Sequence, residues 1–130
     1  PPALESDAAA VIEAVVAVHD ETYHLTCLDF AGGRVTVPRE DLEVGARVRL
    51  KLAARDVSLT LEHQSDTRIL NIFPAVIAEI TEEGSAQVTV RLLAGDGPIL
   101  ARITRKSASD LNLREGMRVY AQVKSVALLS

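Results

Sequence analysis

The chain has 130 residues, a formal net charge of −4 at pH 7 and 48% hydrophobic residues. This length fits one compact domain or two very small ones, and the apolar share is enough for a real core. The negative charge argues against a nucleic-acid surface, which needs a basic patch to displace counterions. With no membrane-spanning apolar run and no secretory signal, the pattern is typical of a cytoplasmic protein. Residues 1–9 are predicted to be a linker from a longer chain.

The first half of the chain predicts short strands separated by polar or glycine-containing turns. Gly32 and Gly33 are predicted to make a hairpin turn, because glycine readily adopts the positive φ that such turns need. Residues 38–42 are predicted to form a short helical turn. The predicted strands cover residues 10–18, 23–28, 34–37, 46–52 and 55–59.

The second half follows the same order of strands and turns. Gly95-Asp-Gly97 is predicted as a hairpin turn, and residues 106–113 as a helical turn capped by Ser107. The predicted strands cover residues 74–80, 87–92 and 99–104, followed by a final strand after Gly116.

The two halves align as a repeat. Residues 45–50 and 116–121 align without gaps, and residues 55–59 align with 124–128 if the first half carries a two-residue bulge. We therefore predict a mainly β fold of two tandem small OB-like β-barrel units, each with a short helical turn. A single irregular β-sandwich is the alternative. The predicted boundaries are 10–62 for the first OB-like unit, 63–68 for a linker and 69–130 for the second unit.

The final strand ends on a cation and a hydroxyl, Lys124 and Ser125. An ammonium group beside a hydroxyl and backbone N–H groups suits a small oxyanion. The alternative is a solvated lysine at a strand end. At the matching strand end, the first half has Arg55 and Asp56, and a carboxylate there would repel an anion. That pair is therefore interpreted as structural.

Other residues are candidates to converge on the same site. Arg68 offers a guanidinium fork, Thr104 a hydroxyl, and Asn71 an amide able to fix neighbouring backbone. Each taken alone is also compatible with a surface or turn position. The three histidines lack metal-ligand spacing, so no metal site is predicted. The sequence also lacks a Gly-x-x-x-x-Gly-Lys-Ser/Thr phosphate loop, so the chain itself is not predicted to be an enzyme.

Residues 68–77, 101–104 and 113–126 resemble the Mop, or molbindin, molybdate-binding domain. With residues 50–61, the chain resembles most closely the TOBE-like, C-terminal regulatory region of the ATP-binding subunit of molybdate ABC importers. The resemblance implies a homodimer that holds molybdate or tungstate between its protomers. The implied contacts are Lys124, Ser125, Thr104 and the segment that contains Arg68, Ile69 and Asn71.

The resemblance also implies a cytoplasmic regulatory domain, peripheral to the inner membrane, that couples oxyanion binding to transporter inhibition. Its partners would be the ATPase domain and, through it, the membrane permease, with no nucleic acid and no direct membrane insertion. The alternative is a structural dimerisation or spacer domain without a functional anion site. The family's usual Ser-Ala-Arg-Asn reads Arg68-Ile-Leu-Asn71 in this chain. Either Arg68 supplies the missing cation from the same strand face, or the site is weakened or lost.

Overall fold

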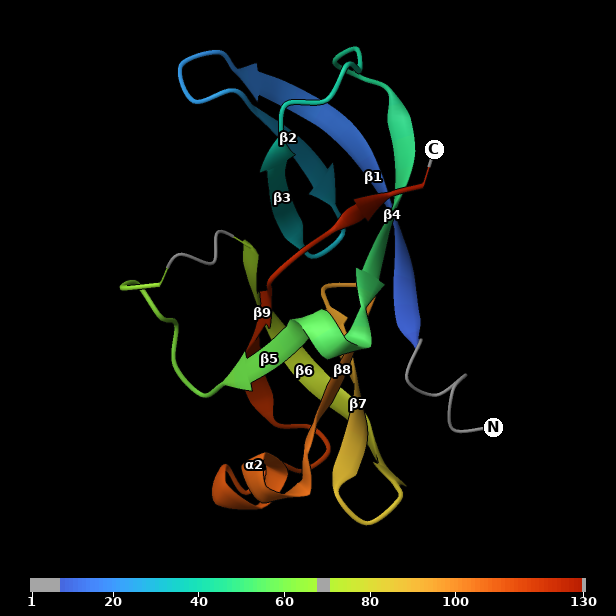
Figure 1. The fold of residues 1–130 in the computed structure, drawn as a ribbon, viewed down its shortest axis with the longest axis vertical. Helices are drawn as coiled ribbons and strands as arrows, with labels where there is room; N and C mark the ends of the chain where they lie inside the picture. Colours follow the sequence, from blue (N-terminus) through green and yellow to red (C-terminus); the bar gives the residue numbers. More distant parts are fainter. Residues whose placement is uncertain (1–7, 68–70, 130) are drawn as a thin grey trace.

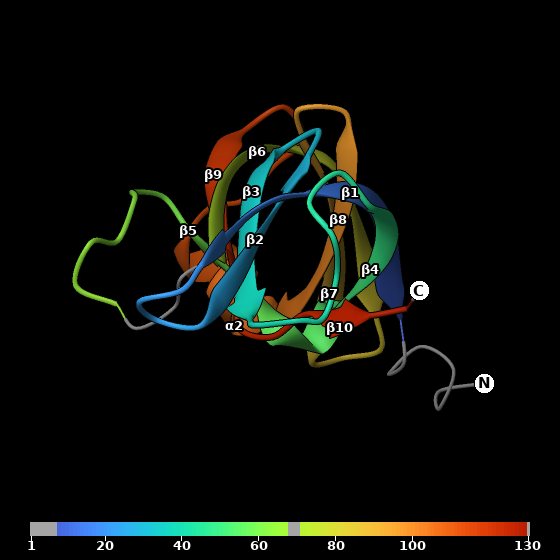
Figure 2. The ribbon, with the colours of Figure 1, turned by 90° about the horizontal axis from the view of Figure 1, so that it is seen from above.

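The chain forms two curled five-stranded antiparallel sheets, one above the other (Figure 1). The computed structural model describes residues 8–67 and 71–129. Sheet A has the strand order β10-β4-β1-β2-β3, and sheet B has the order β5-β9-β6-β7-β8. Viewed from above, the strands curl around the long axis of the molecule (Figure 2). The predicted mainly β architecture of two tandem units is confirmed.

The element bounds agree closely with the predicted strands. Sheet A contains β1 Ala9–Asp20, β2 Leu25–Phe30, β3 Gly33–Pro38, β4 Arg47–Ala53 and β10 Ala127–Leu128. Sheet B contains β5 Val57–Thr60, β6 Asn71–Glu83, β7 Gln87–Ala94, β8 Gly97–Thr104 and β9 Arg118–Val123. A 3-10 turn, η1, covers Ala54–Asp56, and the helix α2 covers Arg105–Asp110.

One hydrophobic core runs through both sheets. The inward positions of β1 alternate with exposed ones, so that Ile12, Ala14 and Val16 are buried. In sheet B, Phe73 and Ile77 of β6 belong to the same cluster of buried side chains. This two-residue period is what a strand with one buried face requires. The core is therefore shared between the two halves of the chain.

The predicted repeat is visible in the main-chain hydrogen bonds. β1 carries a register shift after Val16, and β6 carries one after Ile77. At each shift a turn glycine closes the same contact: the Gly45 N–H donates to the Val16 carbonyl at 2.8 Å, and the Gly116 N–H donates to the Ile77 carbonyl at 2.8 Å. A bulge in the same place bends both sheets alike. The gapless alignment of the two glycines thus reflects equivalent structure.

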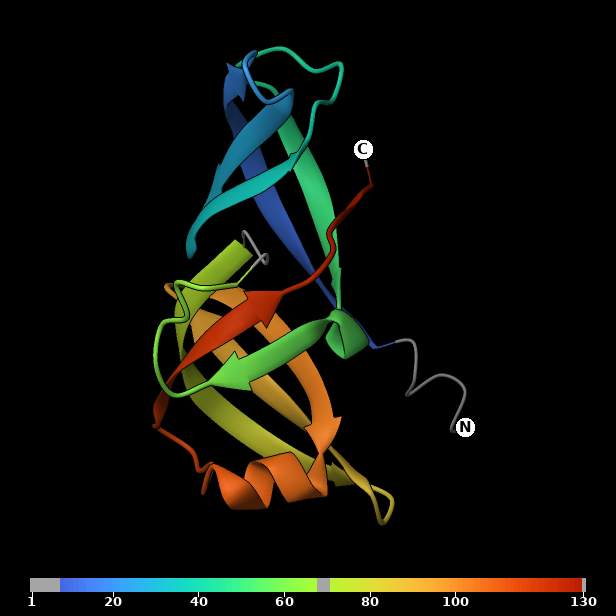
Figure 3. The same cartoon turned by 60° about the vertical axis from the view of Figure 1, so that its left-hand side comes forward.

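The two halves exchange strands. β5 follows β4 in sequence but pairs with β9 in sheet B, with Val57 opposite Val123. β10 follows β9 but crosses to sheet A, where Ala127 lies opposite Lys51 of β4 (Figures 1 and 3). The boundaries predicted at residues 62 and 69 therefore divide the chain but not the sheets.

The helical turn predicted over residues 38–42 is wrong. Pro38 ends β3, and residues 39–42 form an irregular loop, because other segments engage their main-chain N–H groups. The Arg39 N–H donates to the His24 carbonyl at 2.9 Å, and the Glu40 N–H donates to the hydroxyl of Thr26 at 2.9 Å. The two extra residues of the first half also do not form a bulge, since β4 pairs with β1 without interruption from Arg47 to Ala53 and is followed by the 3-10 turn η1.

Two hairpin turns meet where the sheets stack. Both were predicted from their glycines, and the β2–β3 and β7–β8 pairings confirm them. A Cβ placed on Gly95 would overlap the carbonyl oxygen of Ala31, and one placed on Gly32 would lie 2.5 Å from the Cβ of Ala94. The turns thus approach so closely that neither position has room for a side chain. A T-shaped pair of Phe30 and Phe73, with ring centroids 5.0 Å apart, lies in the same contact between the sheets.

The β2–β3 hairpin carries an ion pair that makes its stability depend on pH. Arg34 Nε donates to the Asp29 carboxylate at 2.8 Å, and this hydrogen bond lowers the pKa of Asp29 below its usual value. A lowered carboxyl pKa contributes stability above the unfolded-state pKa, and that contribution is lost as pH falls through the folded-state value. Both side chains are about half exposed, so the effect is small and screened by salt. We expect Arg34→Gln to reduce the difference in urea midpoint between pH 7 and pH 3, and 1 M salt to have a similar effect.

Candidate functional site

The predicted Lys124–Ser125 pair lies where the chain leaves sheet B and crosses toward sheet A. At this crossing the main-chain N–H of Lys124 donates to the Asp56 carbonyl at 2.8 Å. The Ser125 hydroxyl donates to the Asp56 carboxylate at 2.8 Å, between residues 69 positions apart in sequence. The strand ends at Asp56 and Ser125 are equivalent in the alignment of the two halves, and the strand exchange brings them into direct contact. The contact agrees with a structural role for Asp56 but places its carboxylate directly beside Ser125.

A groove of about 350 Å³ lies between the start of β5, the end of β8 and Lys124. Thr104 and Lys124, two of the predicted site residues, both line it. The groove also contains two arginines and one carboxylate, so cations outnumber anions. We call it the strand-end groove; its lining residues are Arg55, Asp56, Val57, Ser58, Gln87, Arg102, Ile103, Thr104, Ser107 and Lys124.

Thr104 is held at the mouth of the groove by the start of α2. Its hydroxyl oxygen accepts a hydrogen bond from the Ser107 N–H at 3.0 Å and donates to the Ser107 hydroxyl at 3.0 Å. Thr104 is therefore the N-cap of α2, and the prediction that Ser107 caps this helix is wrong. Both residue types are good caps, but Thr104 still has extended backbone, as an N-cap requires, whereas Ser107 lies inside the helix.

Replacing this cap has a defined cost. We expect Thr104→Ala to lower the free energy of unfolding by about 1 kcal/mol, because the Ser107 N–H loses its acceptor. Thr104→Ser retains the hydroxyl and should be close to wild type. Thermal unfolding of both variants measures the difference, and an equal loss in both would show that the hydroxyl does not act as the cap.

Asn71 has a different role from the groove residues. It lies opposite Val123 in the β6–β9 pairing, but its side chain reaches β3 of the other sheet. The Asn71 Oδ1 accepts from the Thr36 N–H at 2.7 Å, and its Nδ2 donates to the Thr36 carbonyl at 2.9 Å. The side-chain amide thus continues the ladder at the edge of sheet A. The predicted residues Arg68 and Ile69 lie outside the described residues.

Sequence reasoning missed Arg102 and Gln87. The Nε of Arg102 donates to Gln87 Oε1 at 2.8 Å, across the β7–β8 pair. The Nη1 of Arg102 is buried and has no hydrogen-bond partner among the described residues. A signal was present in the sequence, because residues 102 and 104 share one face of a strand. The sequence therefore places Arg102 on the same side of the strand as Thr104.

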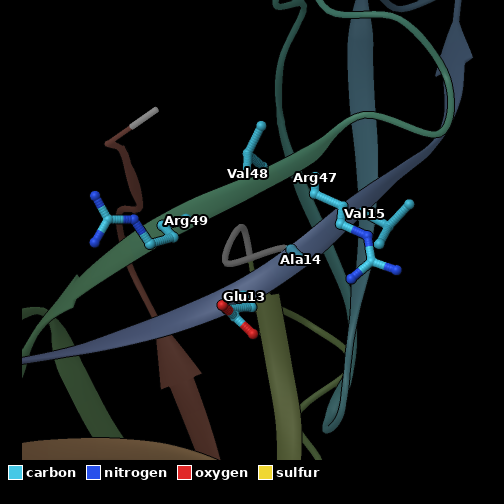
Figure 4. Close-up of a pocket in the computed structure, with 6 residues that line it drawn as sticks. All are labelled: Glu13, Ala14, Val15, Arg47, Val48 and Arg49. Carbon is cyan, nitrogen blue, oxygen red and sulfur yellow. The ribbon is translucent and has the colours of Figure 1, made fainter.

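The other hollows found among the described residues contain none of the predicted site residues. One of about 300 Å³ on the outer face of β1 and β4 holds Glu13, Arg47 and Arg49, but neither guanidinium points at the carboxylate (Figure 4). A larger, mainly apolar one of about 680 Å³ lies on β6, β7 and β9. Within residues 8–67 and 71–129, no cluster of three or more His, Cys, Asp or Glu residues is able to hold a metal ion. In the same part of the chain, no helix has the length and apolar character needed to cross a membrane.

Comparison with protein families matches residues 67–129 to the model of the TOBE domain. This part of the chain is a TOBE domain. It begins just before β6 and ends at β10, so it contains Thr104, Lys124 and Ser125. Its sheet is completed by β5, which lies outside the match. The groove is therefore built by the TOBE domain together with the segment before it.

Similarity to known proteins extends across both halves. The chain is 49% identical over 122 residues to the molybdenum import ATP-binding protein ModC of Albidiferax ferrireducens, covering 94% of this chain and 33% of that protein. It is 48% identical over 130 residues to the molybdenum import ATP-binding protein ModC 1 of Azotobacter vinelandii, covering 99% of this chain and 36% of that protein. The chain thus spans about a third of these relatives and corresponds to their C-terminal region.

The fold is that of a solved molybdate-binding protein. The structure of the cytoplasmic molybdate-binding protein ModG, crystallised with molybdate bound, superimposes with a TM-score of 0.74 and 23% sequence identity. The match covers 91% of this chain and 93% of that one. At this identity the likeness establishes the architecture of the TOBE domain and its preceding unit, a tandem OB-like fold.

Proposed function

We propose that the chain is a cytoplasmic regulatory domain that binds molybdate or tungstate and couples this binding to inhibition of an ABC importer. The observation that carries the proposal is that Thr104 and Lys124 line one cation-rich groove, in a chain similar over nearly its whole length to molybdenum import ATP-binding proteins. An oxyanion needs several converging donors, and the Lys124 ammonium, which has no partner among the described residues, offers charge together with donors.

The groove supplies only part of an enclosed oxyanion site. It is an open surface feature, and the Ser125 hydroxyl already donates to Asp56. We propose that a second protomer completes the site and that Ser125 turns its hydroxyl from Asp56 to the anion. An anion bound between two protomers stabilises only the arrangement that forms its site. The attached ATPase domains would then be held apart, and the subunit would act at the inner membrane through the permease.

Calorimetric titration of the chain with molybdate tests the proposal. We expect binding below millimolar concentration, with tungstate similar and sulfate much weaker. Lys124→Ala should weaken molybdate binding about tenfold, because a charge-assisted hydrogen bond is lost. Lys51→Ala is the matched control, since Lys51 is an exposed lysine on sheet A that does not line the groove. Absence of molybdate binding at millimolar concentration would contradict the proposal.

The second candidate function is a structural dimerisation or spacer domain without an anion site. The Ser125–Asp56 hydrogen bond favours it, because it uses a predicted ligand donor within the chain. The replacement of the family's serine and arginine by Arg68 and Leu70 points the same way. In the full-length transporter, the double variant Lys124→Ala and Ser125→Ala distinguishes the two functions. A spacer would leave inhibition by molybdate unchanged, whereas a regulatory site would lose it.

A further inference from the structure

Arg102 is unusual among the arginines of this chain. Its guanidinium has five N–H donors, of which Nε–H donates to Gln87 Oε1 at 2.8 Å. Its Nη1 is buried without an acceptor among the described residues. A buried donor left unpaired costs stability, and more so when the group is charged. Because Arg102 also lines the strand-end groove, the guanidinium has unused donor capacity beside that groove.

Several other arginines lack this unused capacity. Four of them lie within 4.0 Å of a carboxylate oxygen: Arg34, Arg39, Arg91 and Arg105. Arg102 forms no such ion pair with a described residue, although it shares the groove with the Asp56 carboxylate. That carboxylate is instead bonded to Ser125. Arg102 therefore keeps its charge uncompensated at close range.

We propose that Arg102 is an anion-contacting residue of the strand-end groove, donating a guanidinium N–H to an oxygen of the bound oxyanion. This inference rests on the proposed function and adds a residue that neither the repeat nor the resemblance identified. Its position fits, because β8 places residues 102 and 104 on the same face and Lys124 lines the same groove. The Gln87 hydrogen bond fixes the plane of the guanidinium, so the anion meets an oriented donor rather than a mobile one.

The guanidinium and the Lys124 ammonium would act together on one anion. An ammonium contributes a compact charge, whereas the guanidinium offers a directed N–H donor in a plane oriented by Gln87. Asp56 opposes them, and the charge of Arg102 helps to offset its repulsion of an anion. Replacing Arg102 by lysine should therefore weaken binding even though the charge is kept.

Titration of the 130-residue chain with sodium molybdate tests the inference. We expect Arg102→Lys to weaken binding about fivefold to tenfold and Arg102→Met about tenfold to 100-fold. Arg91→Met is the control, because Arg91 lies on the same sheet but is paired with Glu79. It should bind as wild type does. Thermal unfolding without molybdate separates binding from folding: Arg102→Met should not lower Tm by more than the control does, since the unpaired Nη1–H is removed.

The outcomes separate the inference from the function on which it rests. Wild-type binding that is unchanged in both Arg102 variants overturns the role of Arg102 and leaves the proposed function standing. Weakened binding in Arg102→Met together with wild-type affinity in Arg102→Lys would reduce the role to charge alone and contradict the oriented donor. If Arg102→Met does not fold, the Arg102→Lys titration decides. Absence of binding by the wild-type chain overturns both proposals.

Discussion

Replacing Gly95 by alanine is expected to lower the free energy of unfolding by about 3 kcal/mol or more. Two costs add at this position. Gly95 has a φ of +58°, a left-handed conformation that alanine adopts only with strain. Its new Cβ would also overlap the Ala31 carbonyl oxygen, which belongs to the turn of the other sheet and cannot move as a side chain can. Urea unfolding followed by circular dichroism measures the loss.

Alanine substitutions at two other glycines measure the conformational cost and the packing cost separately. Gly84 has a φ of +75°, but a Cβ added there would have no atom within 4 Å, so Gly84→Ala should show the conformational cost alone, about 1 kcal/mol. Gly32 has no unusual φ but meets Ala94 at 2.5 Å, so Gly32→Ala should show the packing cost alone, about 1–3 kcal/mol. Equal losses at Gly95 and Gly84 would mean that the contact between the two turns does not contribute to stability.

Asn71→Ala is expected to cost about 2–3 kcal/mol of unfolding free energy. The alanine leaves both the N–H and the carbonyl of Thr36 without their partner at the edge of sheet A. It also removes the polar link that joins β6 to β3. Because an unpaired main-chain group is penalised more than a hydrogen bond is rewarded, the loss exceeds that of an ordinary surface amide.

Gln122→Ala is the matched control for this variant. Gln122 is as buried as Asn71, at 7% exposure, and lies on the same sheet. Among the described residues, its side-chain oxygen accepts only a long hydrogen bond from Ser58, at 3.4 Å. Its loss should therefore be clearly smaller than that of Asn71→Ala in the same urea experiment. If both variants lose the same amount, burial of the amide rather than the Thr36 bridge accounts for the effect.

Much of the fold could be predicted from the sequence because its signals are local. Alternation of apolar and polar residues gives the strands their two-residue period, and glycines at 32–33 and 95–97 identify hairpin turns. The repeat followed from a turn glycine recurring in aligned segments. The prediction of a helical turn at residues 38–42 failed because the conformation there is set by hydrogen bonds to His24 and Thr26, which no local pattern reveals.

The candidate site was predicted only in part, and the reason is the strand exchange. Aligning the two halves placed Asp56 and Ser125 at equivalent positions in separate units, whereas β5 and β10 each cross to the other sheet and bring them into contact. The choice of partner for an edge strand depends on tertiary packing, not on the strand's own composition. Thr104 and Lys124 were found from side-chain chemistry, but Arg102 required the burial of its guanidinium to be seen.

The reciprocal exchange of β5 and β10 has a consequence for how the chain folds. Sheet A gains its outer strand only when residues 127–128 reach β4, and sheet B gains β5 only when β9 exists to receive it. Neither half can reach its final hydrogen-bonded state during synthesis of the first half alone. Pairings so distant in sequence have a high contact order, which slows folding and makes it cooperative across the whole molecule. A chain ending near residue 62 should therefore expose β5 and the open edge of β4, and aggregate rather than fold as an independent domain.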